Sequence, residues 1–458
     1  MRLLITLIFL GFVACESSQP ERGHESSDGD PVSIQSTSVA PDLDRGPKQQ
    51  SASPTELADP ADLSRELRGE VPNFFTKRDV PTASSEEKKS AARSINQLAF
   101  NLYGKLGHSK DNLFFSPFSI STALSMTLGG ARGPTASQLR GGLDVGLSNA
   151  RWHAAMGNLG ATVQSGSGCT LHTANGLWAA AAHPTLSSYS GLLRDNYWAE
   201  IESVDFQDEV EVCRTINTWV KDRTRNRIPH IVDENAIDSL TRMILVNAVY
   251  FRGDWLHVFD KRFTYPDDFY RLDGSNSVVP FMNQTGTFNF AEAGGVKVLE
   301  LPYEGAAVSM LIILPNQKNG LSGLEKRLTA TVLDKWSQTL RRTRVEVMLP
   351  RFTFETDLSL EKVLRSLGVV DAFDAEKADF SGVNGHKNDL YLDAVLHKAF
   401  VEVNEEGTEA AAATVSMAKS TGRPPPLPEF MADHPFVFLI RHKTTGAILF
   451  LGRLTDPS

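Results

Sequence analysis

The chain has 458 residues, with 46 Lys and Arg against 55 Asp and Glu, which gives a formal net charge of −9 at pH 7. This acidic balance, with a pI near 5.7, argues against a nucleic-acid-binding protein, because such proteins present basic patches to the phosphate backbone. Beyond the N-terminal segment, no stretch reaches the roughly 18 apolar residues of a transmembrane helix, so we expect the rest of the chain to be soluble.

The first 14 residues have the form of a bacterial secretory signal, in which the basic Arg2 precedes an apolar run too short to span a bilayer. The run ends in FVAC at residues 12–15, which resembles a lipobox, where a signal peptidase leaves Cys15 at the new N-terminus for acylation. An ordinary signal peptide with an incidental cysteine is the alternative, since Phe12 stands where Leu is usual. The place of Cys15 at the end of the run favours lipidation. We therefore expect export across the inner membrane and a lipid anchor in the bacterial envelope, at the outer membrane or the cell surface.

Residues 15–83 are rich in Ser, Pro, Asp, Glu and Gln and show little hydrophobic periodicity. A segment of this composition cannot bury enough apolar surface to offset the entropy of ordering. The sequence therefore predicts a disordered tether of about 70 residues, with a typical reach of about 45 Å.

A folded domain is predicted over residues 84–458. Ser84 stands three residues before Glu87, which is the pattern of a capping box at a helix N-terminus. An apolar face follows at helical spacing, at Ile95, Leu98, Ala99, Leu102 and Leu106. A segment of about 370 residues without a break in composition is long for one core, and its length alone would suggest two or three domains.

Residues 244–251, with the sequence ILVNAVYF, are nearly all apolar and are followed by RGD at residues 252–254. A run of this kind suits a strand that is buried on both faces. Asn247 interrupts the run, and a buried amide side chain needs hydrogen-bond partners. We therefore expect Asn247 to have a buried polar partner.

The segment EEGTEAAAATVSMAKS at residues 405–420 admits two interpretations. Four consecutive alanines favour a short helix or a flexible loop, because Ala has the highest intrinsic helix propensity. As an extended strand the segment would carry only small side chains on one face, which suits insertion into a sheet that is already packed, with Gly407 as a permissive hinge. That face would consist of Thr408, Ala410, Ala412, Thr414, Ser416, Ala418 and Ser420. Composition alone leaves both interpretations open.

Motifs of the common enzyme classes are absent from the sequence. It contains no G-x-S-x-G elbow, no H-E-x-x-H, no G-x-x-x-x-G-K-[ST] and no Cys-x-x-Cys. A catalytic triad is assembled in space rather than in sequence, so the motif search alone does not exclude one. We predict a protein that is not an enzyme and has no cofactor or metal. Whether Cys169 and Cys213 pair cannot be read from the sequence.

Several further blocks stand in a fixed order along the chain. They are NLFFSPFSIS at residues 112–121, ANGLW at 174–178, VDF at 204–206, LVNAVYFRGDW at 245–255, ELPY at 300–303, LPRF at 349–352 and ADFSG at 378–382. In order and rough spacing they resemble the serpins, inhibitors that trap proteases by inserting their own cleaved loop into a sheet. The segment at 405–420, with the apolar blocks on either side of it, resembles the serpin reactive loop. The resemblance runs through the whole of residues 84–458, which implies one domain.

The resemblance implies an α+β serpin fold, with three β-sheets, eight or nine helices and an exposed reactive-centre loop. The family's polar cluster under the opening of the main sheet, the shutter, maps to Ser116, Ser119, Asn247 and His397. A satisfied core histidine is the purely structural interpretation of His397. The breach at the top of that sheet maps to Trp255 and to a salt bridge between Arg351 and Glu405. The hinge maps to Glu405, Glu406, Gly407, Thr408, Glu409, Ala410, Ala411, Ala412, Ala413 and Thr414.

The function implied by the resemblance is inhibition of serine-type endopeptidases, trapped as covalent complexes when the cleaved loop enters the main sheet. Counting from Gly407 by the usual serpin loop length puts the scissile bond at Thr421–Gly422, with Lys419 and Arg423 as competitors. The expected partners are serine proteases, with cysteine proteases as a second class, and the membrane through the lipid. We expect a monomer. The alternative function is that of a non-inhibitory serpin acting as a binding or chaperone module.

Overall fold

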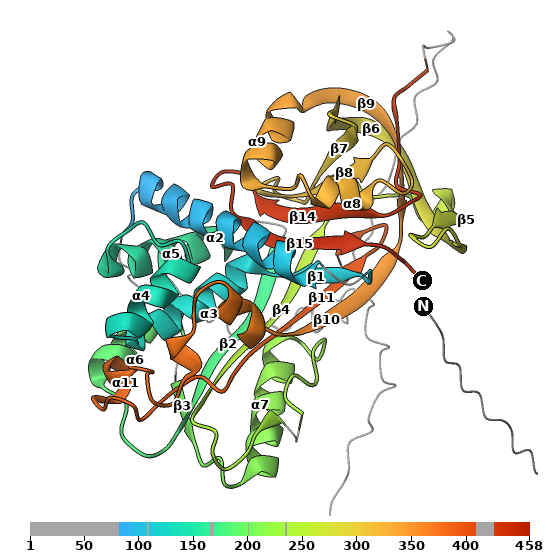
Figure 1. Ribbon diagram of the computed structural model, residues 1–458. Helices are drawn as coiled ribbons and strands as arrows, with labels where there is room; N and C mark the ends of the chain where they lie inside the picture. Colours follow the sequence, from blue (N-terminus) through green and yellow to red (C-terminus); the bar gives the residue numbers. More distant parts are fainter. Residues whose placement is uncertain (1–81, 108–109, 165–168, 200, 234–235, 409–425) are drawn as a thin grey trace, which may run out of the picture. The chain divides into compact units, whose positions relative to one another are not determined.

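The computed structural model describes residues 82–458 except 108–109, 165–168, 200, 234–235 and 409–425 (Figure 1). The predicted signal peptide, nearly all of the predicted tether and most of the predicted reactive loop lie outside these residues. The first described helix, α2 (Ser85–Leu106), begins where the sequence predicts. The Ser84 hydroxyl accepts a hydrogen bond from the Glu87 N–H, and the Glu87 carboxylate accepts one from the Ser84 N–H at 2.8 Å. The predicted capping box is therefore confirmed.

The described residues contain ten α-helices, where eight or nine were predicted. After α2 they are α3 (Pro117–Gly130), α4 (Gly133–Gly142), α5 (Asn149–Gln164), α6 (Ser187–Tyr197), α7 (Glu209–Arg223), α8 (Leu321–Glu325), α9 (Ala330–Thr339), α10 (Glu361–Ser366) and α11 (Ser381–Asn384). The short 3₁₀ helices η2 (Lys261–Phe263) and η3 (Asp371–Phe373) complete the set. Helices α8, α10 and α11 have only four to six residues, which is too short to leave a hydrophobic periodicity in the sequence. Within the described part of the chain, no helix has both the length and the apolar character to cross a membrane.

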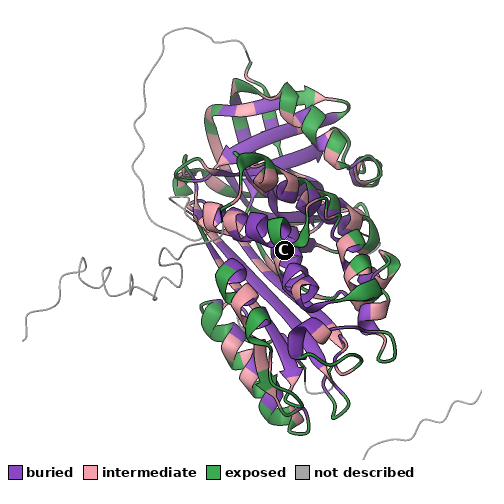
Figure 2. Cartoon of the chain, turned by 90° about the vertical axis from the view of Figure 1, so that its left-hand side faces the viewer, coloured by how far each residue is buried: buried purple, intermediate pink, exposed green. Residues whose placement is uncertain are grey.

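A six-stranded sheet runs through the middle of the domain (Figure 1). Its order is β10 (Phe352–Ser359), β11 (Ala394–Val403), β4 (Met243–Asp254), β2 (Cys169–Ala180) and β3 (Ile201–Val204), with β12 (Gly407–Thr408) also paired to β4. Strand β4 is the strand predicted from its apolar run, and its residues 243–251 are all buried. Leu245 and Val249 belong to the larger core with α3, whereas Ile244 and Val246 belong to a smaller core with α7. The sheet is therefore covered on both faces, as the buried strands in Figure 2 show.

The second sheet has nine strands and contains the other two predicted sheets. Its order is β1 (Leu113–Phe115), β15 (Ile448–Leu454), β14 (Phe436–His442), β8 (Val308–Pro315), β7 (Val296–Pro302), β6 (Asn276–Ala293), β9 (Arg341–Pro350) and β13 (Glu429–Met431), and β5 (Thr264–Tyr270) pairs with β6. Strand β6 is 18 residues long and pairs with β5 through its first half and with β7 through its last residues. One strand thus belongs to two sheets and joins them. The predicted α+β architecture with three sheets is confirmed.

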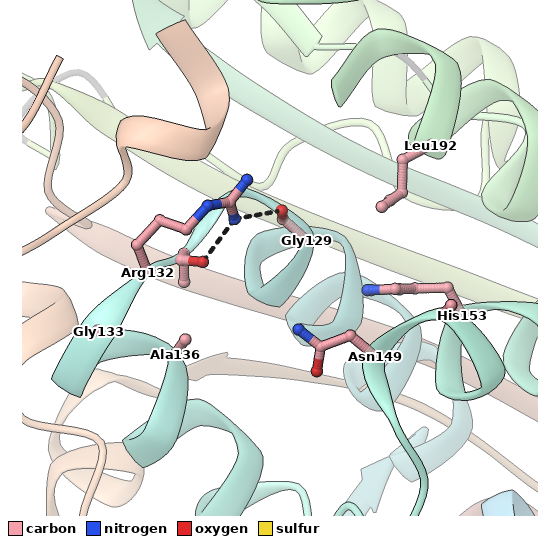
Figure 3. Close-up of a pocket in the computed structure, with 9 residues that line it drawn as sticks. Gly129, Arg132, Gly133, Ala136, Asn149, His153 and Leu192 are labelled. Carbon is pink, nitrogen blue, oxygen red and sulfur yellow. Dashed lines mark hydrogen bonds between the residues drawn. The ribbon is translucent and has the colours of Figure 1, made fainter. Parts of the chain in front are cut away.

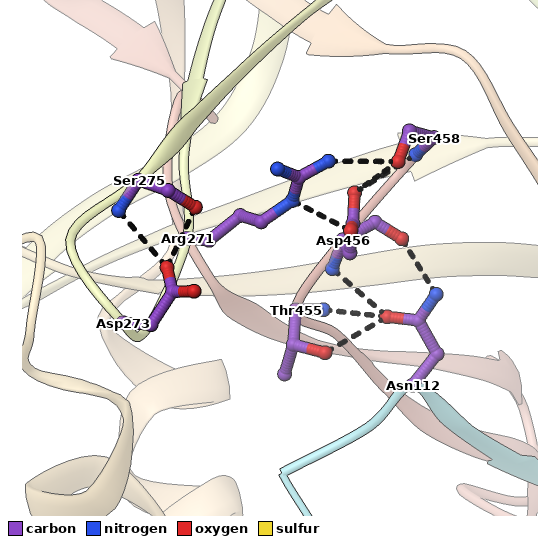
Figure 4. Close-up of polar contacts among 7 residues, drawn as sticks. All are labelled: Asn112, Arg271, Asp273, Ser275, Thr455, Asp456 and Ser458. Carbon is purple, nitrogen blue, oxygen red and sulfur yellow. Dashed lines mark hydrogen bonds and ion pairs between the residues drawn. The ribbon is translucent and has the colours of Figure 1, made fainter. Parts of the chain in front are cut away.

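The C-terminal segment is fixed by side chains from two distant parts of the chain (Figure 4). The side-chain oxygen of Asn112 accepts hydrogen bonds from the N–H groups of Thr455, at 2.7 Å, and Asp456, at 3.0 Å. The Asn112 side-chain nitrogen donates to the Asp456 carbonyl at 2.6 Å. Arg271 lies 2.6 Å from the Asp456 carboxylate and donates to the Ser458 hydroxyl at 3.0 Å. Because β14 and β15 also lie inside the nine-stranded sheet, this segment is an integral part of the fold.

Candidate functional site

A buried hydrogen bond joins the side chains of β11 and β4 in the six-stranded sheet. His397 and Asn247 are paired residues of these parallel neighbours, and the imidazole Nδ1 is bonded to the Asn247 side-chain oxygen. The N–H of Ser116, at the N-cap of α3, donates to the imidazole Nε2 at 3.1 Å. Because Nε2 accepts this bond, the ring proton is on Nδ1, so both ring nitrogens have partners.

The other predicted members of the cluster complete this network. The Asn247 side-chain nitrogen donates to the Ser119 hydroxyl at 2.6 Å and to the side-chain oxygen of Asn175. The Ser116 hydroxyl accepts from the Ser119 N–H at 3.0 Å and donates to the Leu449 carbonyl at 2.7 Å. The structure thus brings together all four predicted residues and gives Asn247 the buried partners that the sequence predicts. We call Ser116, Ser119, Asn175, Asn247 and His397 the polar cluster.

Asn175 of β2 is the member that sequence reasoning missed. It accepts a hydrogen bond from the Ser119 hydroxyl at 3.1 Å as well as the one from Asn247. The signal was present, because Asn175 lies within the block ANGLW and is directly opposite Asn247 across the β2–β4 pairing. Two facing amide side chains in buried strands must satisfy each other or a common partner.

Burial controls the charge of the cluster. His397 is fully buried, and burial lowers the pKa of its imidazole to about 3. The ring is therefore neutral at physiological pH. Protonation would place a second ring N–H against the N–H of Ser116, which already points at Nε2, and would break that contact.

The second predicted group lies where β11 ends. There the chain turns back at residues 404–407 and re-enters the sheet as β12, antiparallel to β4. The backbones of Asn404 and Gly407 bond to each other at 3.0 and 3.3 Å, and the Asn404 side-chain oxygen accepts from the N–H groups of Glu406 and Gly407. We call residues 404–408 the hinge turn.

Gly407 is at the closest approach of the hinge turn to β4. Its φ is +142°, and a Cβ at this position would lie 2.2 Å from the carbonyl oxygen of Gly253. A side chain of any kind would therefore push β12 away from β4. Two physical constraints thus require glycine at position 407, an unusual φ and a close backbone contact.

Trp255, directly after β4, also holds the hinge turn in place through hydrogen bonds. Its N–H donates to the Glu406 carbonyl at 2.8 Å, and its indole N–H donates to the Asn404 carbonyl at 3.0 Å. The indole stacks on Tyr303 with ring centroids 4.5 Å apart. The buried tryptophan is therefore both an apolar support and a double hydrogen-bond donor for the turn.

Glu405 anchors the base of the hinge turn. Its carboxylate is only 2% exposed and accepts a hydrogen bond from the Thr264 hydroxyl at 2.7 Å. The Nε of Arg351, a side chain that is 48% exposed, lies 3.7 Å from the same carboxylate. The predicted pair of Arg351 and Glu405 is thus present as a long contact at the surface. Thr264 is the closer partner, and nothing in the sequence marked it.

The remaining predicted residues do not enter this geometry. Thr408 ends β12, whereas Cys15, the hinge residues 409–414, Lys419 and the residues 421–423 around the predicted scissile bond lie outside the described residues. Cys169 and Cys213 are described, and no disulfide joins them. Burial raises the pKa of the Cys169 thiol to about 12, so this thiol is not a reactive nucleophile.

Comparisons with known proteins agree with this arrangement. A family model described as "Serpin (serine protease inhibitor)" matches residues 93–457. Serpin B8 of Homo sapiens is 39% identical over 363 residues, which cover 78% of this chain and 96% of the relative. The leukocyte elastase inhibitor of Bos taurus is 42% identical over 356 residues, which cover 76% and 93%. The solved structure of Serpin48 from the insect Tenebrio molitor matches with a TM-score of 0.72 and 33% identity, covering 81% of this chain and 99% of that chain.

The polar cluster predicts how stability depends on pH. Because the pKa of His397 is lowered to about 3 in the fold, the unfolded state binds a proton first as the pH falls. The contribution of His397 to the free energy of unfolding is therefore constant above pH 6.5 and decreases by about 1.4 kcal/mol per pH unit between 6.5 and 3. His153 and His172, whose pKa values burial lowers to about 4, act in the same direction.

Urea unfolding at pH 7.5 and pH 5.0 checks this prediction. His397→Ala should cost about 1–3 kcal/mol at pH 7.5, because Asn247 and Ser116 lose a buried partner. Its loss of stability on acidification should be smaller than that of the wild type by about 1.4 kcal/mol per pH unit. His230→Ala, at an exposed position, is the matched control and should behave as the wild type. Equal pH slopes for wild type and His397→Ala would contradict the prediction.

Proposed function

The chain belongs to the serpin family, which is a family of serine protease inhibitors and not of enzymes and whose non-inhibitory members are the exception, and we propose that it traps its target protease by loop insertion. In this proposal the protease attacks the exposed loop and forms an acyl-enzyme through its own nucleophile. Residues from Thr408 onward then enter the six-stranded sheet between β4 and β11. The attached protease is carried along and distorted before it can deacylate.

The observation that carries the proposal is the direction and register of β12. Gly407 pairs with Asp254 and Thr408 with Gly253 in the antiparallel sense, and Gly407 also bridges to Asn404 at the end of β11. The two partners of Gly407 are 150 positions apart (404 minus 254). Ala394 of β11 and Ile244 of β4, which pair directly, are also 150 apart (394 minus 244). A strand that continues from β12 would therefore match both neighbours without any slip in register.

The same register explains why the loop residues are small. If pairing continues, Ala410 would lie beside Phe251 and Ala412 beside Val249, and paired residues point to the same face. Phe251 and Val249 belong to the larger core, which is already filled. Alanine can enter such a core, whereas each additional methylene group there causes strain. The strand interpretation of residues 405–420 thus gains a physical reason that the helix interpretation lacks.

One polar residue in the small face has a specific partner in this register. Thr414 would lie between Asn247 of β4 and His397 of β11. Parting these strands breaks the hydrogen bond between the two side chains, and a buried group left without a partner costs about 1–3 kcal/mol. The Thr414 hydroxyl can accept from His397 and donate to Asn247, which would restore both bonds.

The energy for insertion comes from the ladders that form. One parallel ladder between β4 and β11 is replaced by two antiparallel ladders, with each new bond worth about 0.5–1.5 kcal/mol. About 13 inserted residues at roughly 3.3 Å each would move the protease by about 40 Å. About a dozen such bonds are enough to drive the change.

We assign the scissile bond to Thr421–Gly422. A small β-branched Thr before the bond suits a protease with a shallow primary pocket, of elastase or subtilisin type, and a bovine relative is named leukocyte elastase inhibitor. Lys419 and Arg423 would suit a trypsin-like enzyme, whose pocket pairs a cation with a buried acid. Cleavage after either residue would change the insertable strand by two residues and disturb the timing of insertion against deacylation.

We also propose that the protein is a bacterial lipoprotein, anchored through Cys15. The FVAC sequence at the end of the signal supports this assignment, and Glu16 is not the Asp that often retains lipoproteins at the inner membrane. The predicted tether of about 70 residues would hold the inhibitory domain about 45 Å from the membrane. The inhibitor would then act on proteases that reach the envelope surface.

A panel of serine and cysteine proteases tests the proposed function. The purified protein should form a complex with at least one of them that survives SDS. If no protease in the panel forms such a complex, whether or not it cleaves the loop, the alternative holds and the protein is a non-inhibitory serpin.

The hinge gives a prediction about trapping. Thr408→Arg should convert the inhibitor into a substrate, because an unpaired cation would have to enter the core face of the sheet. A cost of a few kcal/mol should lower the yield of covalent complex at least about tenfold while cleavage continues. Glu409→Arg is the matched control, since the continued register places it on the opposite face beside the half-buried Arg252 and Glu402, and it should still trap. Equal yields from both variants would refute the register.

Thr414 gives a prediction about the inserted state. Thr414→Val keeps the shape but removes the hydroxyl, and it should slow insertion, so that a larger fraction of molecules is cleaved without trapping. The inserted state should be destabilised by about 1–3 kcal/mol, which lowers the melting temperature of the cleaved protein by a few degrees. Thr414→Ser retains the hydroxyl and should resemble the wild type. Calorimetry of the cleaved proteins measures the difference, and identical melting temperatures for Val and Ser would rule out the exchange of partners.

The scissile bond is checked by intact-mass analysis of the C-terminal fragment from the trapped complex. The fragment should begin at Gly422. Because the contacts of Figure 4 hold this segment in the fold, the complex must be denatured before the measurement. A fragment beginning at Ser420 or Pro424 would overturn the Thr421 assignment.

The anchor is checked by metabolic labelling with a clickable fatty acid. The wild type should be labelled and sediment with membranes, whereas Cys15→Ser should be unlabelled and released. Absence of label on the wild type would reject lipidation without affecting the proposed inhibition.

A further inference from the structure

A cavity of about 510 Å³ lies among four helices and shares no residue with the hinge turn or the polar cluster (Figure 3). It is bounded by the end of α3, the first turns of α4 and α5, and Leu192 of α6. Small residues such as Gly129, Ala136 and Ala150 leave the space open. Its volume is within the range of small-molecule sites, about 300–1,000 Å³.

One side of the cavity presents a ring nitrogen of His153. His153 is only 4% exposed, and Figure 3 shows the ring nitrogen farthest from its backbone pointing into the cavity. Its other ring nitrogen, Nδ1, is 2.5 Å from the Tyr197 hydroxyl. Within the described residues, Nε2 has no hydrogen-bond partner. This nitrogen is therefore available to water or to a ligand that enters the cavity.

Burial and the nearby Arg140 lower the pKa of the His153 imidazole to about 4, so the ring is neutral at pH 7. A neutral imidazole nitrogen either donates or accepts one hydrogen bond, and a ligand hydroxyl suits both cases because it can do either.

The opposite side of the cavity presents donors and positive charge. Arg132 uses one nitrogen, Nη1, for the carbonyl oxygens of Gly129 and Ala131, and no carboxylate of the described part of the chain forms an ion pair with it. The Asn149 side-chain oxygen accepts from Arg140, which leaves its NH₂ group turned toward the cavity in Figure 3. Asn149 also begins α5, whose first turn contains no acidic residue. These groups favour an anion.

We propose that this cavity binds a small organic acid that carries a hydroxyl group beyond its carboxylate. The carboxylate meets Arg132 and Asn149, the apolar middle of the ligand packs against Leu192 and Ala136, and the hydroxyl meets Nε2 of His153. The requirement for a hydroxyl distinguishes this ligand class from simple fatty acids of the same size.

A matched pair of acids tests the proposal by isothermal titration calorimetry on the full chain. The probes are 3-(4-hydroxyphenyl)propanoate and 3-phenylpropanoate, which differ only in the hydroxyl. Both should bind, and the hydroxylated acid should bind roughly 3- to 10-fold more tightly because of its bond to His153. His153→Phe should abolish this preference. Arg132→Gln should weaken the binding of both acids about tenfold or more.

Two variants at exposed positions test the cavity without disturbing the packed core, as a control for the variants at buried positions. Ala150→Phe fills the cavity from the first turn of α5 and should abolish binding of both acids. Ser137→Phe, exposed on α4 and outside the cavity lining, should bind as the wild type. Absence of saturable binding, equal affinity of the wild type for the two acids, or retained binding by Ala150→Phe would each overturn the proposal.

Discussion

The hydrogen bond from His397 to Asn247 is the constraint on which the rest of the site depends, because it crosses the boundary between β11 and β4. Backbone bonds between strands can be exchanged for equivalent bonds with a new strand. A fully buried side-chain pair can part only if each group finds another partner. Ser116 ties this pair to α3 and Asn175 ties it to β2, so the boundary is held by a helix and a neighbouring strand as well as by its own ladder. The two strands can therefore separate only if another polar group replaces these side-chain hydrogen bonds.

The two ends of this boundary are built differently. Direct pairing of β11 with β4 runs from Ala394 to Phe400 and stops there, and above it the hinge turn places Gly407 and Thr408 beside β4. The turn is held by specific contacts, those of Trp255, Thr264 and the Asn404 side chain, rather than by strand pairing alone. The upper end therefore already has the geometry of an added strand, while the lower end keeps the geometry of a closed sheet.

Much of this arrangement followed from the sequence, for physical reasons that differ between residues. The capping box at Ser84 and the buried strand around Asn247 are local patterns, which short-range physics dictates. The four predicted cluster residues came from resemblance, since no local rule brings Ser116 and His397 together across 281 positions. Thr264 was missed because a single polar residue in a strand leaves no periodic signal. Asn175 lies in the block ANGLW, but its position opposite Asn247 depends on strand pairing, which the sequence does not show. The pairing of β12 depends on a backbone contact with Gly253 that no side chain encodes.

The strand order of the nine-stranded sheet has a consequence for biosynthesis. Strands β14 and β15 lie between β8 and β1, yet they come from residues 436–454, long after both neighbours in the chain. The sheet therefore stays incomplete, with exposed edges on β1 and β8, until this late segment leaves the ribosome. Those edges must remain unpaired or be covered by a chaperone in the meantime. The nine-stranded sheet is thus completed only when nearly the whole chain has been synthesised.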